Sequence, residues 1–241
     1  MALATRDVSE PLRVLVGELG ATVLSGGQLP GFRPMQVRLG DGEHGMTVEL
    51  LEPWEPATND FLARFLDRHG DGPHHLTIKV DDFDAALDAV RATGRDVVGV
   101  NRADPWWHEA FIVPRDAFGT VVQLAAQPPD AGFPARFARV RARGPDGEPA
   151  WWPTVPPRAP DPVRLRQVVL RTGDVKAGRA FFGDLLGGEV LTDGSGFVEL
   201  GWPGGGRLRL EDGAEPGGIS RLELEGDLPE RVIAGTRFVS A

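Results

Sequence analysis

Two stretches that lie far apart in the chain carry the same order of apolar and polar positions. Residues 5–24 (TRDVSEPLRVLVGELGATVL) and 172–191 (TGDVKAGRAFFGDLLGGEVL) align without a gap. In each, an aspartate precedes an amphipathic run and a glycine precedes a new strand, which predicts a helix with Asp7 or Asp174 as its N-cap. One face of the first helix is predicted to be apolar, because hydrophobic residues recur at helical spacing: Val8, Leu12, Leu15 and Leu19.

A second correspondence links residues 72–82 (GPHHLTIKVDD) with 217–227 (GGISRLELEGD). After the first of these, residues 83–94 (FDAALDAVRATG) predict a further amphipathic helix that ends at Gly94. Three strand-like runs follow, DVVGV, EAFIVP and GTVVQLA. The repeating unit is therefore strand, helix, strand, strand, strand. It is predicted at residues 1–52, 73–126 and 165–211, with a fragment at 217–241.

Between the second and third units the pattern stops in a segment dense in Pro and Gly. We therefore expect three parts: a domain of two modules at 1–126, a linker or wrapping segment at 127–162, and a degenerate, incomplete domain at 163–241. Trp151 and Trp152 in the segment are expected to dock on a domain surface. The chain after LEGD is too short for a helix and two strands, so the last unit must stay incomplete.

Composition limits the classes of function. The chain of 241 residues has no cysteine, which excludes disulfides and thiolate chemistry, and its formal net charge of −9 argues against a nucleic-acid partner. No apolar run reaches the length of a membrane span, and no signal peptide opens the chain. We expect a cytoplasmic protein that acts on a small molecule, with neither a membrane nor a nucleic-acid partner and with a homodimer as an open possibility.

The tandem repeat, with HHLTIKVDD opening one unit and GTVVQL closing it, resembles the vicinal oxygen chelate superfamily. This group includes glyoxalase I, extradiol dioxygenases, bleomycin-resistance proteins and methylmalonyl-CoA epimerase, and the epimerase is the nearest local resemblance. The resemblance implies an α+β, glyoxalase-like fold, in which tandem β-α-β-β-β modules form a U-shaped mixed sheet. It also implies a divalent metal held by inward side chains of the first and fourth strands of each module.

Carried over by position, the implied metal ligands are Glu49, His75 and Gln123, and Glu49 is also the implied catalytic base. Each has a plain alternative: His75 as a structural histidine, Glu49 as an exposed strand carboxylate of the kind that Glu52 illustrates, and Gln123 as polar surface. The metal could be Co, Ni, Mn, Zn or Fe. The family's first ligand falls directly before Met1, and we expect in-frame upstream codons to supply it as a histidine, with a glutamine as the alternative.

The pattern also departs from the epimerase, because the carboxylate and amide ligands of the two modules are exchanged here. An iron dioxygenase needs two histidines and a carboxylate, so that activity is disfavoured. In the third module, Gln167, Arg209 and Arg221 occupy the ligand positions. Two guanidinium groups repel a cation, which leaves a scaffold or an anion-binding cleft.

Further candidates lie in loops. Trp106, Trp107 and His108 could line the substrate cleft, although packing explains them equally well, and His44 is expected to be solvated. The function implied is a metal-dependent isomerase, epimerase or lyase acting on a small carbonyl compound or acyl thioester. The alternative is a non-catalytic small-molecule-binding protein of the resistance type that uses the same cleft without metal.

Overall fold

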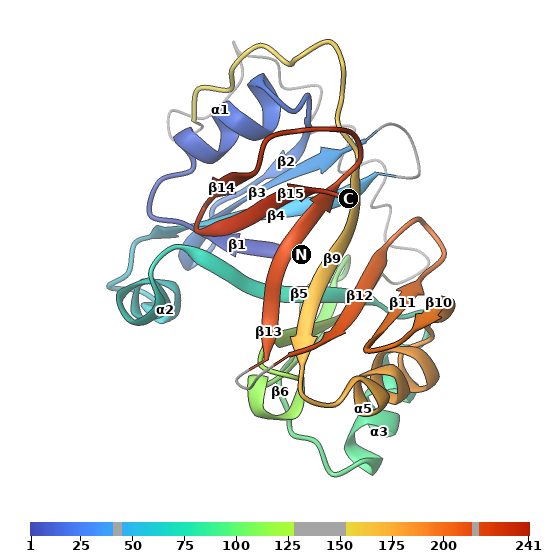
Figure 1. Cartoon of the computed structure of the whole chain (residues 1–241). Coiled ribbons are helices and arrows are strands. Elements are labelled where there is room, and N and C mark those ends of the chain that lie inside the picture. The colour runs from blue at the N-terminus through green and yellow to red at the C-terminus, as the bar shows by residue number, and fades with distance from the viewer. Residues whose placement is uncertain (41–44, 128–152, 214–216) are drawn as a thin grey trace. The chain divides into compact units, whose positions relative to one another are not determined.

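The computed structural model describes residues 1–40, 45–127, 153–213 and 217–241 (Figure 1). The described residues fall into two compact units, which are treated separately below. Unit 1 contains 1–40, 45–74, 153–166 and 222–241, and unit 2 contains 75–127, 167–213 and 217–221. Three earlier predictions lie outside the described residues: the docking of Trp151 and Trp152, the solvated His44, and most of the Pro-rich segment.

Unit 1 contains the first predicted module. Its elements are β1 (Ala2–Ala4), α1 (Ser9–Gly17), β2 (Thr22–Gly26), β3 (Gly31–Leu39) and β4 (Met46–Trp54). The strand order is β2-β3-β4-β1, with β1 parallel to β4 and the other pairs antiparallel. The predicted apolar face of α1 is buried as expected: Val8, Leu12, Leu15 and Leu19. The N-cap of α1 is Val8, one residue later than the predicted Asp7. Asp7 instead accepts the backbone N–H of Ser9 at 2.8 Å.

Unit 2 contains the greater part of two further modules with the same topology, whose first strands begin in unit 1. The first comprises β5 (Gly72–Lys79), α3 (Phe83–Ala92), β6 (Val97–Asn101), β7 (His108–Ile112), the short η2 (Pro114–Asp116) and β8 (Val121–Ala126). The second comprises β9 (Leu165–Thr172), α5 (Val175–Arg179), the π-helical η4 (Ala180–Leu185), β10 (Glu189–Gly194), β11 (Phe197–Gly201) and β12 (Arg207–Asp212). The strand orders are β5-β8-β7-β6 and β10-β11-β12-β9. Repetition of one module in mixed sheets confirms the predicted α+β, glyoxalase-like fold class.

Local signals account for the helices of unit 2. Asp82 and Asp174 cap α3 and α5 by accepting the N–H groups of Ala85 at 2.9 Å and Ala177 at 2.8 Å. α3 buries Phe83, Leu87 and Val90, the face that the sequence predicts, and packs against β8. α3 therefore covers one face of its sheet, and polar side chains of β5, β7 and β8 lie on the other. None of the helices in the described ranges has the length and apolar character of a membrane span.

The C-terminal fragment forms three strands, β13 (Gly218–Leu224), β14 (Arg231–Ile233) and β15 (Thr236–Ser240), in the order β13-β15-β14. In the described chain no helix separates β13 from β14. Within unit 1, Arg231 pairs with Glu18 at 2.6 Å and so fastens β14 to the end of α1. Residues 153–166 run along α1 too, since Val163 donates its backbone N–H to Leu19 O at 2.9 Å. The predicted domain boundaries stay a prediction.

Unit 1 also contains a helix that the repeat does not predict, α2 (Phe61–His69), placed between β4 and β5. Its buried leucines, Leu62 and Leu66, pack on Leu51 and on the alanines of β1 in one apolar cluster. Leu51 is on the same side of β4 as Glu49, because residues two apart share a face of a strand. α2 therefore covers one end of the sheet face that carries Glu49.

Candidate functional site

One face of the unit 2 sheet brings together a histidine and a glutamine from neighbouring strands. β5 and β8 run parallel, and their register pairs Thr77 with Gln123. The antiparallel pairing of β7 with β8 sets Phe111 opposite Gln123 as well. Because side chains alternate along a strand, His75 points to the same face as Thr77. His75 is buried, and its ring is edge-on to Phe111 with centroids 6.2 Å apart.

The side-chain amide of Gln123 is held at both ends. Thr77 Oγ1 donates to Gln123 Oε1 at 2.8 Å, and Gln123 Nε2 donates to Glu109 Oε2 at 2.8 Å. A carboxylate can only accept, so Glu109 selects the amide nitrogen and fixes the orientation of the group. The amide oxygen consequently points away from Glu109. It keeps a second lone pair for another partner, because a carbonyl oxygen accepts two bonds.

Glu109 and Thr77 were not among the site residues predicted from the sequence. Glu109 lies in β7, opposite Ala125, one register step from Gln123. Glu109 opens the predicted strand-like run EAFIVP, and the strand itself begins one residue earlier, at His108. The alternation of Trp107, Glu109 and Phe111 is a period-two pattern that could have placed all three on one face.

The predicted cleft residues occupy three different environments. Trp107 Nε1 donates to Glu109 Oε2 at 3.2 Å, so Trp107 belongs to the same polar group as Gln123. Lys79 Nζ lies 5.8 Å from the centroid of the Trp107 ring, within cation–π range. Trp106 is exposed. His108 points to the other face, where its ring lies 5.8 Å from that of Phe83 on α3. A role in substrate binding stays a prediction for all three.

In unit 1, Glu49 is half-buried on β4, and its register partner on β3 is Gln36. Gln36 Nε2 donates to Glu49 Oε1 at 3.0 Å, and Ser25 Oγ donates to Gln36 Oε1 at 3.0 Å. A ladder of three side chains across β2, β3 and β4 thus fixes the carboxylate. The convergence of Glu49 with His75 and Gln123, which belong to unit 2, stays a prediction.

Glu52 corrects the comparison made from sequence, because it is not an exposed carboxylate. It is buried on the opposite face of β4 from Glu49, where it pairs with Arg33 and accepts the backbone N–H of Val8 at 3.4 Å. A buried carboxylate is stable only when it is paired and hydrogen-bonded, and both conditions hold here. Of the two strand carboxylates, Glu52 is therefore the structural one.

His74 differs from its neighbour His75 in its surroundings. It lies within unit 1, with its ring centroid 4.7 Å from Phe65 and 6.0 Å from Phe61, both on α2. Burial lowers the pKa of His74 to about 4, because the charged imidazolium is poorly solvated there. His74 is therefore a neutral aromatic side chain at neutral pH.

The third module fills the corresponding face with ion pairs. Its register pairs Glu199 with Arg209, as the first module pairs Gln36 with Glu49. Arg209 binds Glu199 at 2.8 Å and Glu211 at 2.7 Å, and Arg221 binds both oxygens of Glu211 at 2.8 and 2.7 Å. The hydrogen bonds from Arg221 lower the pKa of Glu211 to about 2, with a further contribution from Arg209.

This network bears on the two interpretations of the third module. Its two guanidinium groups are neutralised by two carboxylates of the same unit, so no net positive charge is left to attract an anion. Gln167, at the remaining ligand position, is buried and donates to Glu199 Oε1 at 3.4 Å. The ion pairs favour a scaffold over an anion-binding cleft, and the role of this face stays a prediction.

The fold resemblance implies a divalent metal ion, and these side chains are its candidate ligands. In the described part of the chain, no three His, Cys, Asp or Glu side chains form a group that could hold a metal ion. A site with fewer such groups needs another oxygen ligand, and the oriented amide oxygen of Gln123 supplies one on the same sheet face as His75. The unit 2 donors therefore fit two positions of a mixed imidazole and oxygen site.

Comparison with known proteins agrees with this fold. The family model described as the glyoxalase/bleomycin resistance protein/dioxygenase superfamily matches residues 1–136, which is more than half of the chain. A methylmalonyl-CoA epimerase from Mycobacterium tuberculosis is 23% identical, with 55% of this chain and 88% of that chain covered and a TM-score of 0.47. No curated protein matches the sequence significantly.

Two further solved structures are similar over about half of the chain. A variant of the Streptomyces coelicolor methylmalonyl-CoA epimerase in complex with 2-nitronate-propionyl-CoA is 21% identical, with 53% and 92% coverage and a TM-score of 0.46. A hypothetical protein from Bacillus halodurans is 23% identical, with 53% and 91% coverage and a TM-score of 0.46. From the match of the family model and the repeated module, the chain belongs to the glyoxalase/bleomycin resistance protein/dioxygenase superfamily.

Proposed function

We propose that the chain binds a divalent metal ion at the face that carries His75 and Gln123, and that it catalyses a proton transfer of the isomerase or epimerase type. The substrate class is a small carbonyl compound or an acyl thioester. The observation that carries the proposal is the amide of Gln123, fixed by Thr77 and Glu109 on the same face as the buried His75.

His75 and Gln123 are the proposed ligands in unit 2, and Glu49 is the proposed third ligand. When bound, the ion would supply a Lewis acid that polarises a substrate carbonyl and acidifies the neighbouring C–H. Thr77 and Glu109 are positioning residues, because they orient the amide before any ion arrives. Such outer hydrogen bonds typically change metal affinity by about 10- to 100-fold when they are removed.

Glu49 is also the proposed base that takes a proton from the substrate carbon. A carboxylate suits this role when it is held rigidly within reach of the proton. Gln36 restrains Glu49 through the 3.0 Å bond to Oε1, and both residues lie on paired strands rather than on loops. The base is thus oriented without help from the substrate.

In the experiment, the full chain is incubated separately with Co, Ni, Mn, Zn or Fe(II), and unbound metal is then removed. Bound metal is measured for the unmodified chain, His75→Ala and Gln123→Ala. His108→Ala and Gln127→Ala serve as matched controls, since His108 faces α3 and Gln127 bonds Lys79 at the end of the sheet. We expect His75→Ala and Gln123→Ala to lose metal and the two controls to retain it.

Activity is then measured as exchange of the substrate α-proton with deuterium from D2O, across acyl thioesters and small carbonyl compounds. Exchange that requires both metal and Glu49 supports the proposal. If the unmodified chain takes up no metal, or if His75→Ala retains it fully, the metal assignment is wrong. Saturable binding of the same compounds without metal or exchange would instead identify a non-catalytic binding protein.

A further inference from the structure

A hollow in unit 2 lies on the helical side of the sheet, apart from the His75–Gln123 face. It has a volume of about 320 Å³ and is lined by the end of α3 on one side and by α5 and η4 on the other. α3 covers the sheet face opposite the one that carries Gln123. The hollow is therefore lined by neither His75 nor Gln123. Its size is at the lower end of the range of small-molecule pockets.

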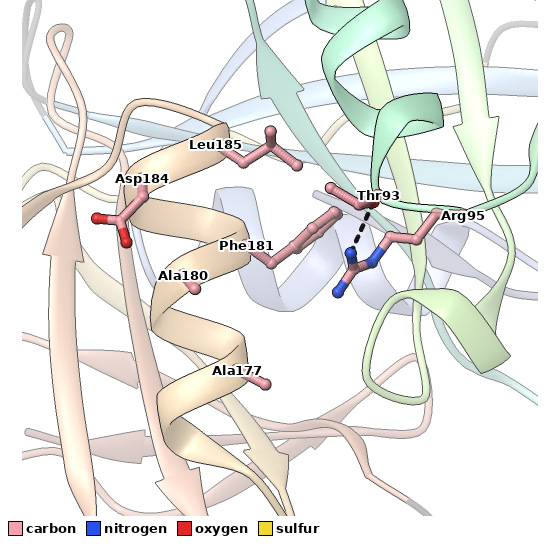
Figure 2. A pocket seen from close by; sticks show the side chains of 7 residues that line it. All are labelled: Thr93, Arg95, Ala177, Ala180, Phe181, Asp184 and Leu185. Carbon is pink, nitrogen blue, oxygen red and sulfur yellow. Dashed lines mark hydrogen bonds between the residues drawn. The ribbon is translucent and has the colours of Figure 1, made fainter.

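Most of the lining is apolar, and one charged donor faces it. Figure 2 shows Ala177, Phe181 and Leu185 on the side opposite Arg95, while Asp184 points away from the hollow. Arg95 is half-buried, and its guanidinium carbon lies 4.7 Å from the centroid of the Phe181 ring. A guanidinium group stacked on an aromatic ring is attracted to it and loses side-chain freedom before any ligand binds.

Hydrogen bonds to the protein fix the orientation of this guanidinium group further. Arg95 Nε donates to Asp116 O at 2.9 Å, and Nη1 donates to Thr93 Oγ1 at 2.8 Å. Arginine has five N–H groups, so these two bonds leave three for another partner. No carboxylate among the described residues lies within ion-pair distance of Arg95, unlike the half-buried Arg33, Arg209 and Arg221.

The aromatic wall behind the guanidinium group is rigid. Phe181 is buried and packs edge-on against Phe182 with centroids 4.9 Å apart, and Phe118 lies 5.7 Å from Phe181 and 5.9 Å from Phe182. Phe181 and Leu185 both lie in the π-helical η4, a rare conformation that is frequent at functional sites. The wall and the guanidinium group are therefore formed before a ligand arrives.

We infer that this hollow binds a small monocarboxylate with a flat or branched apolar body. Arginine recognises a carboxylate through two parallel N–H···O bonds, and the remaining N–H groups of Arg95 suffice for this pair. The apolar body would lie against Phe181 and Leu185. Inorganic phosphate has no apolar body to lie against these side chains, which favours a monocarboxylate over phosphate.

Sodium benzoate is the probe for the test, titrated into the full ¹⁵N-labelled chain and followed by NMR. We expect saturable shifts of the backbone amides of residues 93–95 and 177–185, with a dissociation constant on the order of 1 mM. Benzamide, which has the same shape without the charge, and inorganic phosphate should each bind at least about tenfold more weakly. His75→Ala should leave benzoate binding unchanged, so this inference and the proposed function fail separately.

Two variants test the contacts. Arg95→Gln should weaken benzoate binding at least about tenfold. Arg91→Gln should not, because Arg91 is an exposed arginine of α3 that pairs with Asp88. Ala180→Leu keeps Arg95 but fills the hollow from an exposed position of η4, so it should also weaken benzoate binding. This variant is the deciding test if Arg95→Gln does not fold. Absence of saturable binding to the unmodified chain overturns the inference, as does equal affinity for benzoate and benzamide or binding unaffected by Ala180→Leu.

Discussion

Gln123 donates its side-chain N–H to Glu109 at 2.8 Å although the two residues are not register partners, since Glu109 lies opposite Ala125. The bond runs diagonally across β7 and β8. It turns the amide oxygen of Gln123 away from Glu109 and toward Thr77, whose hydroxyl it accepts. A glutamine that could otherwise rotate freely is thereby given one donor end and one acceptor end.

The Glu109 carboxylate is predicted to set metal affinity without being a ligand. In Glu109→Gln, the new amide can donate as well as accept, so the orientation of Gln123 is no longer enforced. We expect metal affinity, measured by competition with a chelator, to fall about tenfold while the far-UV circular dichroism is unchanged. Glu189→Gln, a change of an exposed strand glutamate, should have no effect. Equal affinities for the unmodified chain and Glu109→Gln would remove Glu109 from the site.

Thr77 provides an isosteric test at the other end of the amide. Thr77→Val removes the hydroxyl that donates to Gln123 Oε1 but keeps the branched shape favoured in strands. We expect a loss of metal affinity of about tenfold for Thr77→Val and recovery in Thr77→Ser, which restores a hydroxyl. Loss in both variants to the same extent would point to packing instead of orientation.

Glu211 is predicted to make stability depend on acid pH. Its pKa is about 2 in the folded chain and near 4.5 when unpaired, so the unfolded state binds more protons between these values. The stabilisation is therefore complete above pH 4.5 and is lost as the pH falls toward 2. From pH 7 to 3.5, we expect the unmodified chain to lose roughly 1–2 kcal/mol more unfolding free energy than Glu211→Gln. Urea unfolding at both pH values measures this difference, and parallel losses in the two proteins would contradict it.

Alanine at Gly119 is predicted to destabilise the fold more than alanine at Gly94. Both have positive φ, +81° and +80° respectively, which costs a residue with a side chain about 1 kcal/mol. A Cβ at Gly119 would also lie 2.2 Å from the backbone oxygen of Gly217 in the same unit, whereas nothing lies within 4 Å of a Cβ at Gly94. Gly119→Ala should lower the unfolding free energy by more than about 2 kcal/mol, and Gly94→Ala by about 1 kcal/mol. Equal losses in urea unfolding would show that the segment at Gly217 moves aside.

The repeated module could be predicted from the sequence because its signals are local. Asp82, Asp174 and the apolar positions of α1 and α3 act on residues a few positions away, and the structure places the helices there. The helix α2 escaped this reasoning because it lies outside the repeat and is held by contacts with Leu51 and β1. Period and capping thus identify the elements of a module, while an inserted element depends on the surface it covers.

The hydrogen-bond partners of the site were decided by tertiary structure alone. The sequence placed Glu52 on the surface, yet Glu52 is buried with Arg33 on one face of β4 while Gln36 fixes Glu49 on the opposite face. Partners such as Gln123 and Glu109 depend on strand register, which is set when whole strands pair, and not by neighbours along the chain. The sequence determined which residues could act at the site, and only the paired strands decided what each one contacts.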